Sequence, residues 1–216
     1  MKKIFIFDLD GTILDTVHTI AYYVNDALKH FGFPENETDA YKYFAGNGAT
    51  NLIHRALAAH GLDTEENFNK VFPYYMENYN KNTLYKTEHF PNMPETLKAL
   101  KEKGIKIAVV SNKPDSTVQP LLPHFFEDGL FDIAFGAREN VPLKPNPSAV
   151  NEVLDLYGLT PEDAVYVGDT GTDMQTGKNA GIFTVGVLWG FRDEKELLEF
   201  GADVLISKAE DLLLYV

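Results

Sequence analysis

The distribution of apolar residues divides the chain into a helical part and a part in which strands alternate with helices. Residues 4–7 are four consecutive large apolar side chains, a pattern typical of a strand buried on both faces of a parallel sheet. From 16 to 82, apolar residues such as Val17, Ile20 and Val24 recur at the spacing of one helix face. No strand pattern interrupts this stretch. We therefore expect a small helical bundle inserted directly after the first strand.

Beyond residue 86, short apolar segments alternate with helical patterns. The predicted strands lie at 107–110, 131–135, 164–167, 183–188 and 203–206. Such alternation is typical of a doubly wound parallel sheet with helices on both faces. The predicted fold class is therefore α/β, with a doubly wound parallel sheet formed by 1–15 and 84–216. An all-helical domain, 16–83, is inserted into it.

Composition and charge narrow the classes of partner. The chain has 216 residues, of which 44% are hydrophobic and 24% charged, an ordinary globular balance. Its formal net charge of −13 argues against nucleic acid as the main partner, because a basic footprint is missing. A small anionic substrate is compatible with this charge only if cations are placed locally at its site.

Several kinds of site and location are disfavoured. The chain has no cysteine, which excludes a disulfide, a thiol nucleophile and a thiolate metal site. The start Met1-Lys2-Lys3 leads straight into a strand, without the apolar region of a signal peptide. No apolar run approaches the about 18 residues of a membrane span. We expect a cytoplasmic protein without membrane contact, either a monomer or a homodimer.

Two acidic residues directly follow the first predicted strand. Asp8 and Asp10 stand one residue apart, and Gly11 beside them allows a sharp turn. Open α/β sheets bind ligands at the carboxyl ends of their strands. Two carboxylates at such a place are unfavourable unless a divalent cation or a shared proton offsets their charge. The pair is therefore the first part of a candidate site.

Polar residues also follow three later strands. They are Ser111, Asn112 and Lys113 after 107–110, Lys144 after 131–135, and Asp169 with Asp173 after 164–167. In a parallel sheet, all of these converge with the first acidic pair on one edge. Asp169 and Asp173 are four residues apart, so one helical turn can direct both to the same point. An oxygen-rich carboxylate site of this kind suits a hard cation such as Mg²⁺.

Each motif alone has an ordinary structural explanation. An acidic pair after a strand is often a solvated turn, a Ser-Asn pair often closes a strand, and acids are favoured at a helix N-terminus. Together and in this order, the motifs favour an active site. They resemble those of the haloacid dehalogenase (HAD) superfamily phosphatases: Asp-x-Asp-Gly-Thr, a Ser or Thr, a Lys, and Gly-Asp-x-x-x-Asp. The helical insertion resembles the cap of that family.

The resemblance implies a role for each residue. Asp8 is the expected nucleophile, which forms an aspartyl phosphate, and Asp10 the general acid and base. Mg²⁺ is expected on Asp8, the backbone carbonyl of Asp10 and Asp169, with Asp173 nearby or bound through water. The phosphoryl oxygens are expected to contact Ser111 and Lys144. The other residues of the predicted sheet domain that are expected to bind substrate are Thr12, Asn112 and Lys113.

A loop in the helical insertion resembles part of the bacterial phosphoglycolate phosphatases. It contains Gly46-Asn47-Gly48 and is followed by a helix with Arg55, the only arginine of the predicted cap. The segment 189–191, Trp-Gly-Phe, also resembles that subfamily. The loop is equally compatible with a simple two-glycine turn before a helix. On this resemblance, a small phosphorylated metabolite, 2-phosphoglycolate, is a candidate substrate, and Arg55 a candidate contact for its carboxylate.

Other functions remain open as alternatives. Sugar-phosphate mutases of the β-phosphoglucomutase kind resemble the chain, but Thr12, Ile20 and Ala49 stand where those enzymes have an apolar residue, a His and an Arg. Asp10 argues against dehalogenases and phosphonate hydrolases, which lack the second aspartate. A receiver-like signalling protein would be about half as long and would have no helical insertion. A catalytically inactive binding protein is disfavoured by the intact acidic set.

Overall fold

A computed structural model describes all residues, 1–216, and the chain forms two compact units. The first unit comprises Met1–Asp15 and Glu88–Val216, and the second comprises Thr16–Thr87. The first contains every long-range strand pairing of the sheet, whereas the second consists mainly of helices. None of the helices combines the length and the apolar character needed to cross a membrane.

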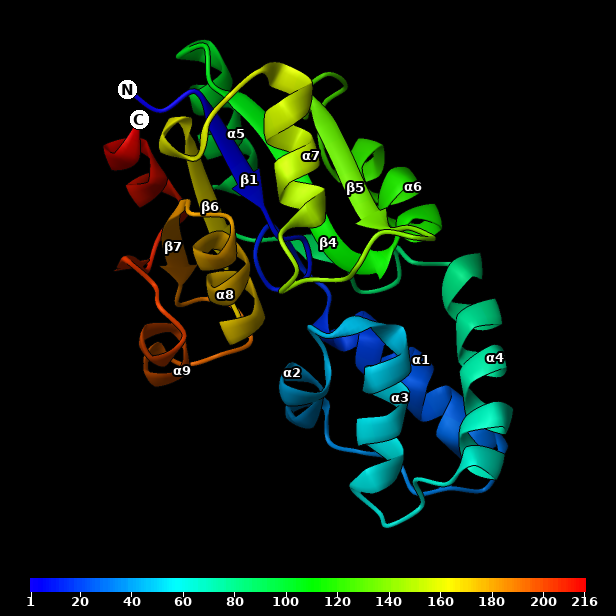
Figure 1. Cartoon of the computed structure of the whole chain (residues 1–216). Coiled ribbons are helices and arrows are strands. Elements are labelled where there is room, and N and C mark those ends of the chain that lie inside the picture. The colour runs from blue at the N-terminus through cyan, green and yellow to red at the C-terminus, as the bar shows by residue number, and fades with distance from the viewer. The chain divides into compact units, whose positions relative to one another are not determined.

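The first unit is built on a six-stranded sheet in the order β5-β4-β1-β6-β7-β8 (Figure 1). All neighbouring strands are parallel, which confirms the predicted α/β sheet. The strands are β1 Ile4–Phe7, β4 Lys106–Pro114, β5 Ile133–Ala137, β6 Ala164–Gly168, β7 Phe183–Val187 and β8 Val204–Ile206. A separate antiparallel pair joins β2, Leu14–Asp15, to β3, Glu88–His89.

Strand β1 occupies the centre of the sheet because all four of its side chains are apolar and fully buried. Its last residue, Phe7, lies opposite Val109 of β4 and Val167 of β6. The residues that follow these three partners therefore leave the sheet at the same edge. This register brings chemistry from three distant parts of the chain together.

Helices cover both faces of the sheet, and Figure 1 shows α7 in front of it and α5 behind. The helices of this unit are α5 Met93–Glu102, α6 Asp115–Phe125, α7 Ser148–Tyr157, α8 Gly171–Asn179 and α9 Glu194–Glu199, with short 3-10 helices at Pro161–Asp163 and Ala209–Tyr215. The inward face of α7 packs with β1, β4 and β6 in one apolar cluster. Burial of that cluster holds the strand ends in register.

The second unit contains the helices that the apolar spacing predicted. They are α1 Val17–His30, α2 Tyr41–Phe44, α3 Gly48–Ala58 and α4 Glu65–Lys81, with a 3-10 turn at Thr38–Ala40. The returning segment after α4 stays with this unit, since Thr19 Oγ1 donates to the carbonyl of Tyr85 and lies 2.8 Å from Thr87 Oγ1. The unit therefore extends to Thr87, whereas the sequence placed the return to the core at 84.

Two of the predicted strands differ from the sequence prediction by more than one residue at an end. Strand β4 continues through Pro114 instead of ending at 110, with an irregular register against β5 between Val110 and Pro114. Strand β5 begins at Ile133 and not at 131, because the Asp132 carboxylate accepts hydrogen bonds from Ile107 N at 2.7 Å and from Lys101 Nζ at 2.7 Å. A side-chain acceptor thus takes the place of a backbone partner at the start of β5.

Candidate active site

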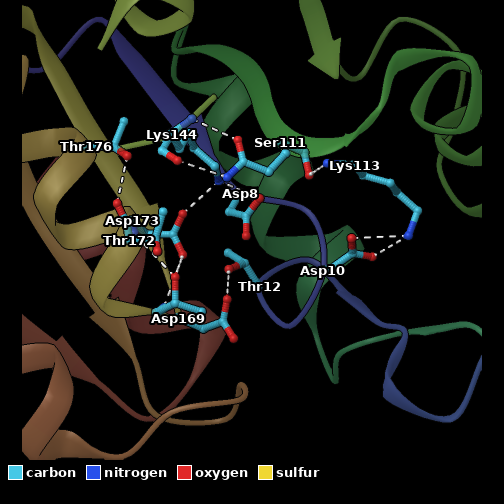
Figure 2. Close-up of polar contacts among 12 residues, drawn as sticks. Asp8, Asp10, Thr12, Ser111, Lys113, Lys144, Asp169, Thr172, Asp173 and Thr176 are labelled. Atoms are coloured by element: carbon cyan, nitrogen blue, oxygen red, sulfur yellow. Dashed lines mark hydrogen bonds and ion pairs between the residues drawn. The ribbon is translucent and has the colours of Figure 1, made fainter. Parts of the chain in front are cut away.

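Three carboxylates meet at the carboxyl ends of β1 and β6 (Figure 2). Asp8 follows β1, Asp169 follows β6, and Asp173 lies on the first turn of α8. Each offers an oxygen within 4.8 Å of the others, and all three side chains are buried. The predicted convergence of these strand ends therefore holds for this part of the site.

Lys144 is the cation of this centre. Its ammonium lies 2.7 Å from Asp8 Oδ1 and 2.7 Å from Asp173 Oδ1. The loop that carries Lys144 is fixed by Asn112, whose side chain accepts from Lys144 N at 2.8 Å and donates to the Lys144 carbonyl at 3.1 Å. In this structure, Asn112 holds the backbone of Lys144, a contact that the sequence did not predict.

The buried charges shift one another's ionisation. Burial, and then the charge of Asp173, raise the pKa of Asp8 from 3.8 to about 7. Burial, and then the charges of Asp173 and Asp8, raise the pKa of Asp169 well above its ordinary value. Burial alone would lower the pKa of Lys144, but Asp173 and Asp8 raise it well above 10.5. The centre therefore contains three carboxylates and one ammonium, which contacts only Asp8 and Asp173, so it favours a further positive charge.

The donor set fits a hard divalent cation. All three acids present oxygen, the chain has no cysteine thiolate to act as a ligand, and the burial of these side chains strengthens ionic contacts. Burial, and then like-charge repulsion, raise the pKa values of Asp8 and Asp169, and a bound cation would relieve that repulsion. These residues could hold Mg²⁺, as the sequence predicted.

Asp169 and Asp173 are held by different hydrogen-bond donors. Thr12 Oγ1 donates to Asp169 Oδ1 at 2.9 Å, and Phe191 N donates to Asp169 Oδ2 at 2.7 Å. Asp173 Oδ2 accepts from Thr170 N at 3.1 Å and from Thr170 Oγ1 at 2.6 Å, a reciprocal cap of α8. Thr170 is not among the site residues expected from the sequence, although a Thr three residues before an Asp is a recognisable capping pattern.

Asp10 lies outside the three-carboxylate centre and has its own cation. Lys113 Nζ lies 2.8 Å from Asp10 Oδ1 and 3.1 Å from Oδ2, and the Lys113 side chain is 5% exposed. Ser111 is also buried, and its Oγ accepts from Lys113 N at 3.2 Å. The irregular end of β4 thus supplies both a hydroxyl and an ammonium to this edge of the sheet.

The glycine-rich loop belongs to the helical unit. Gly46 and Gly48 have φ values of 106° and 84°, conformations that favour glycine. Arg55 Nη1 donates to the carbonyls of Tyr43 at 3.2 Å and Phe44 at 3.0 Å. Its Nη2 donates to Asn47 Oδ1 at 2.7 Å, which ties α3 to its own preceding loop. The expected contact of Arg55 with a substrate carboxylate stays a prediction.

The two groups of residues in the core suit different chemical tasks. A buried carboxylate beside a fixed ammonium, as in Asp8 and Lys144, can present an oxygen nucleophile to an anionic group. A second, separate carboxyl, Asp10, can exchange a proton without belonging to that centre. The arrangement therefore supports transfer of a group to the Asp8 carboxylate, with a proton supplied by Asp10.

Comparisons with known proteins agree with this geometry. Residues 5–187 match the family model of the haloacid dehalogenase-like hydrolases. The phosphoglycolate phosphatase of Aquifex aeolicus is 35% identical over 211 residues, with 98% of this chain and 95% of that protein covered. The phosphoglycolate phosphatase of Haemophilus influenzae is 33% identical over 216 residues, with 98% and 96% covered.

Solved structures extend the likeness to the fold. A proposed phosphoglycolate phosphatase from Lactobacillus delbrueckii subsp. bulgaricus has a TM-score of 0.93 and 33% sequence identity, with 98% of this chain and 97% of that chain covered. The family resemblance that the motifs indicated is thereby confirmed. The chain is an enzyme of the haloacid dehalogenase-like hydrolase family, similar along nearly its whole length to phosphatases.

Proposed function

We propose that this enzyme hydrolyses small phosphomonoesters, with 2-phosphoglycolate among its better substrates, and that Asp8 is the covalent nucleophile. The proposal is carried by the buried contact of Asp8 Oδ1 with the Lys144 ammonium, 2.7 Å long, at the carboxyl end of the sheet. A carboxylate oxygen beside a fixed cation suits attack on a negatively charged phosphoryl group. The relatives named phosphoglycolate phosphatase support the substrate.

In the first step, an Asp8 oxygen forms a bond to phosphorus, and the bond from phosphorus to the substrate alcohol breaks. Lys144 and Ser111 bind the phosphoryl oxygens, over which negative charge spreads in the transition state. Both side chains are already buried in fixed positions, so little reorganisation accompanies the reaction. The product of this step is an aspartyl phosphate and a free alcohol.

Asp10 transfers the protons. Its carboxyl group protonates the leaving alcohol, and the resulting carboxylate then deprotonates the water that attacks the aspartyl phosphate. The water oxygen bonds to phosphorus, the bond from phosphorus to the Asp8 oxygen breaks, and inorganic phosphate leaves. Lys113 holds this group through both oxygens, so that it keeps one position through the two steps. We therefore assign Lys113 a positioning role, through Asp10. Thr12 positions Asp169 in the same way, and Asn112 positions Lys144.

Mg²⁺ is the cation that we propose for the acidic centre. Asp8, the backbone carbonyl of Asp10 and Asp169 would hold it, with Asp173 beside it or bound through water. When bound, the ion supplies positive charge that stabilises the phosphoryl oxygens. Asp173 also contacts Lys144, and its Oδ2 is bound to Thr170, so it orients the ammonium as well as adding to the charge of the site.

We propose that the helical unit acts as a cap that selects the leaving group. Its glycine-rich loop, Gly46-Asn47-Gly48, is shaped by Arg55, and we assign substrate selection to this loop. A small metabolite is favoured over nucleic acid, because a chain with a net charge of −13 repels extended polyanions. We expect the enzyme to act in the cytoplasm.

A screen of small phosphomonoesters ranked by kcat/KM, with and without Mg²⁺, tests this function. We expect 2-phosphoglycolate near the top of the ranking and no isomerisation of β-glucose 1-phosphate. Excess chelator should abolish turnover, Mg²⁺ should restore it, and Ca²⁺ should do so poorly because it takes more ligands at longer distances. Full activity in excess chelator would contradict the proposed metal dependence. A poor rank for 2-phosphoglycolate would contradict the proposed substrate.

A further inference from the structure

Residues 189–191, which begin two positions after the end of β7, contact both loops of the acidic centre. Trp189 Nε1 donates to the carbonyl of Thr12 at 3.0 Å, and Phe191 N donates to Asp169 Oδ2 at 2.7 Å. Thr12 in turn donates from Oγ1 to Asp169 Oδ1 at 2.9 Å. These contacts form a closed chain between the loop after β1 and the loop after β6. We call residues 189–191 the clamp.

The middle residue of the clamp has no room for a side chain. A Cβ on Gly190 would lie 2.3 Å from Asp169 Cβ and 2.5 Å from the Gly11 carbonyl oxygen. Gly11 faces the same carboxylate, and a Cβ there would lie 2.2 Å from Asp169 Oδ2. Asp169 is therefore enclosed between two glycines, and a methyl group on Gly190 must displace either Asp169 or the backbone of the β1 loop.

We propose that the clamp is a positioning element for the cation site, because it fixes Asp169 relative to the loop that carries Asp8. This inference rests on the proposed function, which assigns Asp169 to the cation. Asp169 Oδ1 accepts a hydrogen bond from Thr12, whose carbonyl is bound by the clamp, and Asp169 Oδ2 accepts one from the clamp itself. The Asp169 side chain is fully buried. Groups that orient a metal ligand in this way commonly change metal affinity by about 10- to 100-fold when altered.

Calorimetric titration of the metal-free full-length protein with Mg²⁺ tests the clamp without relying on turnover. We expect Gly190→Ala to raise the Kd about tenfold or more. Trp189→Phe keeps an aromatic side chain, though a smaller one, but removes the N–H donor, so we expect its Kd to rise about threefold. Gly186→Ala is the matched control on β7, since its Cβ would press on the side-chain ends of Leu205 and Leu197 and touch the Cβ of Ala202, none of them in the clamp, and its Kd should equal that of the wild type.

Circular dichroism establishes whether each variant is folded. If Gly190→Ala fails to fold, the Kd of Trp189→Phe alone tests the clamp. Wild-type Kd values in the folded clamp variants would overturn the proposal, provided that Asp169→Asn weakens Mg²⁺ binding strongly. If Asp169→Asn itself bound Mg²⁺ like the wild type, the proposed cation site would be wrong, and the role of the clamp would fall with it. Equal weakening by Gly186→Ala would also overturn the proposal, because it would reflect general strain on β7.

Discussion

The acidic centre of the core and the glycine-rich loop of the helical unit are organised by contacts of very different range. In the core, Lys113 meets Asp10 across 103 residues of sequence, and Thr12 meets Asp169 across 157. In the loop, Arg55 binds groups only 8 to 12 residues away. The core site exists only when the sheet has formed, whereas the loop is held by its own segment.

The two regions also differ in what their cations face. Lys144 is buried between two carboxylates, and burial together with the neighbouring charges raises the pKa values of both Asp8 and Lys144. Arg55 donates to two backbone carbonyls and one amide oxygen. Substitutions in the core should therefore alter the chemistry for every substrate, while those in the loop should alter its shape and the choice of substrate.

The largest effect should come from Asp8→Asn, which keeps the size of the side chain but removes its anion. We expect kcat to fall by about a thousandfold or more on every phosphomonoester, because the covalent route loses its nucleophile. Steady-state assays with a purified, folded variant measure this. Asn47→Ala, in the glycine-rich loop, is the matched comparison and should keep most of the activity on p-nitrophenyl phosphate. Near-normal turnover by Asp8→Asn would place the chemistry elsewhere.

Lys113→Met should distinguish a positioning role from a substrate-binding role. We expect kcat/KM for 2-phosphoglycolate to fall about 10- to 100-fold, because its alkoxide leaving group needs the proton from Asp10. The value for p-nitrophenyl phosphate should change little, since an acidic phenol leaves without protonation. Lys103→Met, at an exposed lysine, is the control. Equal losses on both substrates would mean that Lys113 binds the phosphoryl group.

A smaller effect is expected from Arg55, and Arg55→Lys is the sharper variant. Lysine keeps the charge but cannot bridge the three acceptors that the guanidinium holds. We expect Arg55→Lys and Arg55→Ala to raise the KM for 2-phosphoglycolate by a similar factor. If Arg55→Lys retains the wild-type KM and only Arg55→Ala loses affinity, the charge itself matters, as in direct contact with a substrate carboxylate.

The smallest effect concerns the stability of the metal-free protein. Burial and Asp173 raise the folded-state pKa of Asp8 from 3.8 to about 7. The stabilising contribution of protonated Asp8 is therefore complete below its unfolded-state pKa, about 4, and is lost as the pH rises through about 7. We expect the Tm of the chelator-treated wild type to fall by several degrees more across this window than that of Asp8→Asn, measured by calorimetry. Parallel curves would contradict this account of the centre.

The sheet and the convergence of acidic residues could be predicted because they follow from local patterns. The apolar run before Asp8 and the Val-Tyr-Val segment before Asp169 indicate buried strands, and parallel pairing then forces their carboxyl ends to one edge. The helices of the inserted unit were predicted for a similar reason, since their apolar residues recur along one face.

Contacts that depend on backbone groups could not be predicted in this way. The donor to the Asp169 carboxylate is the backbone N–H of Phe191, which every residue type except proline supplies, so the identity of residue 191 carries no signal for this contact. The pairing of Lys113 with Asp10 arises from the irregular end of β4, which redirects a side chain. Strand propensity does not encode such irregularities.

Trapping of the covalent intermediate tests the central claim most directly. The enzyme would be mixed with 2-phosphoglycolate and Mg²⁺, quenched in acid during turnover, and mapped by peptide mass spectrometry. We predict one phosphoryl group on the peptide that contains Asp8, and none there in Asp8→Asn. Active enzyme with no phosphorylated Asp8 at any quench time, or with the phosphoryl group on another residue, would contradict the account.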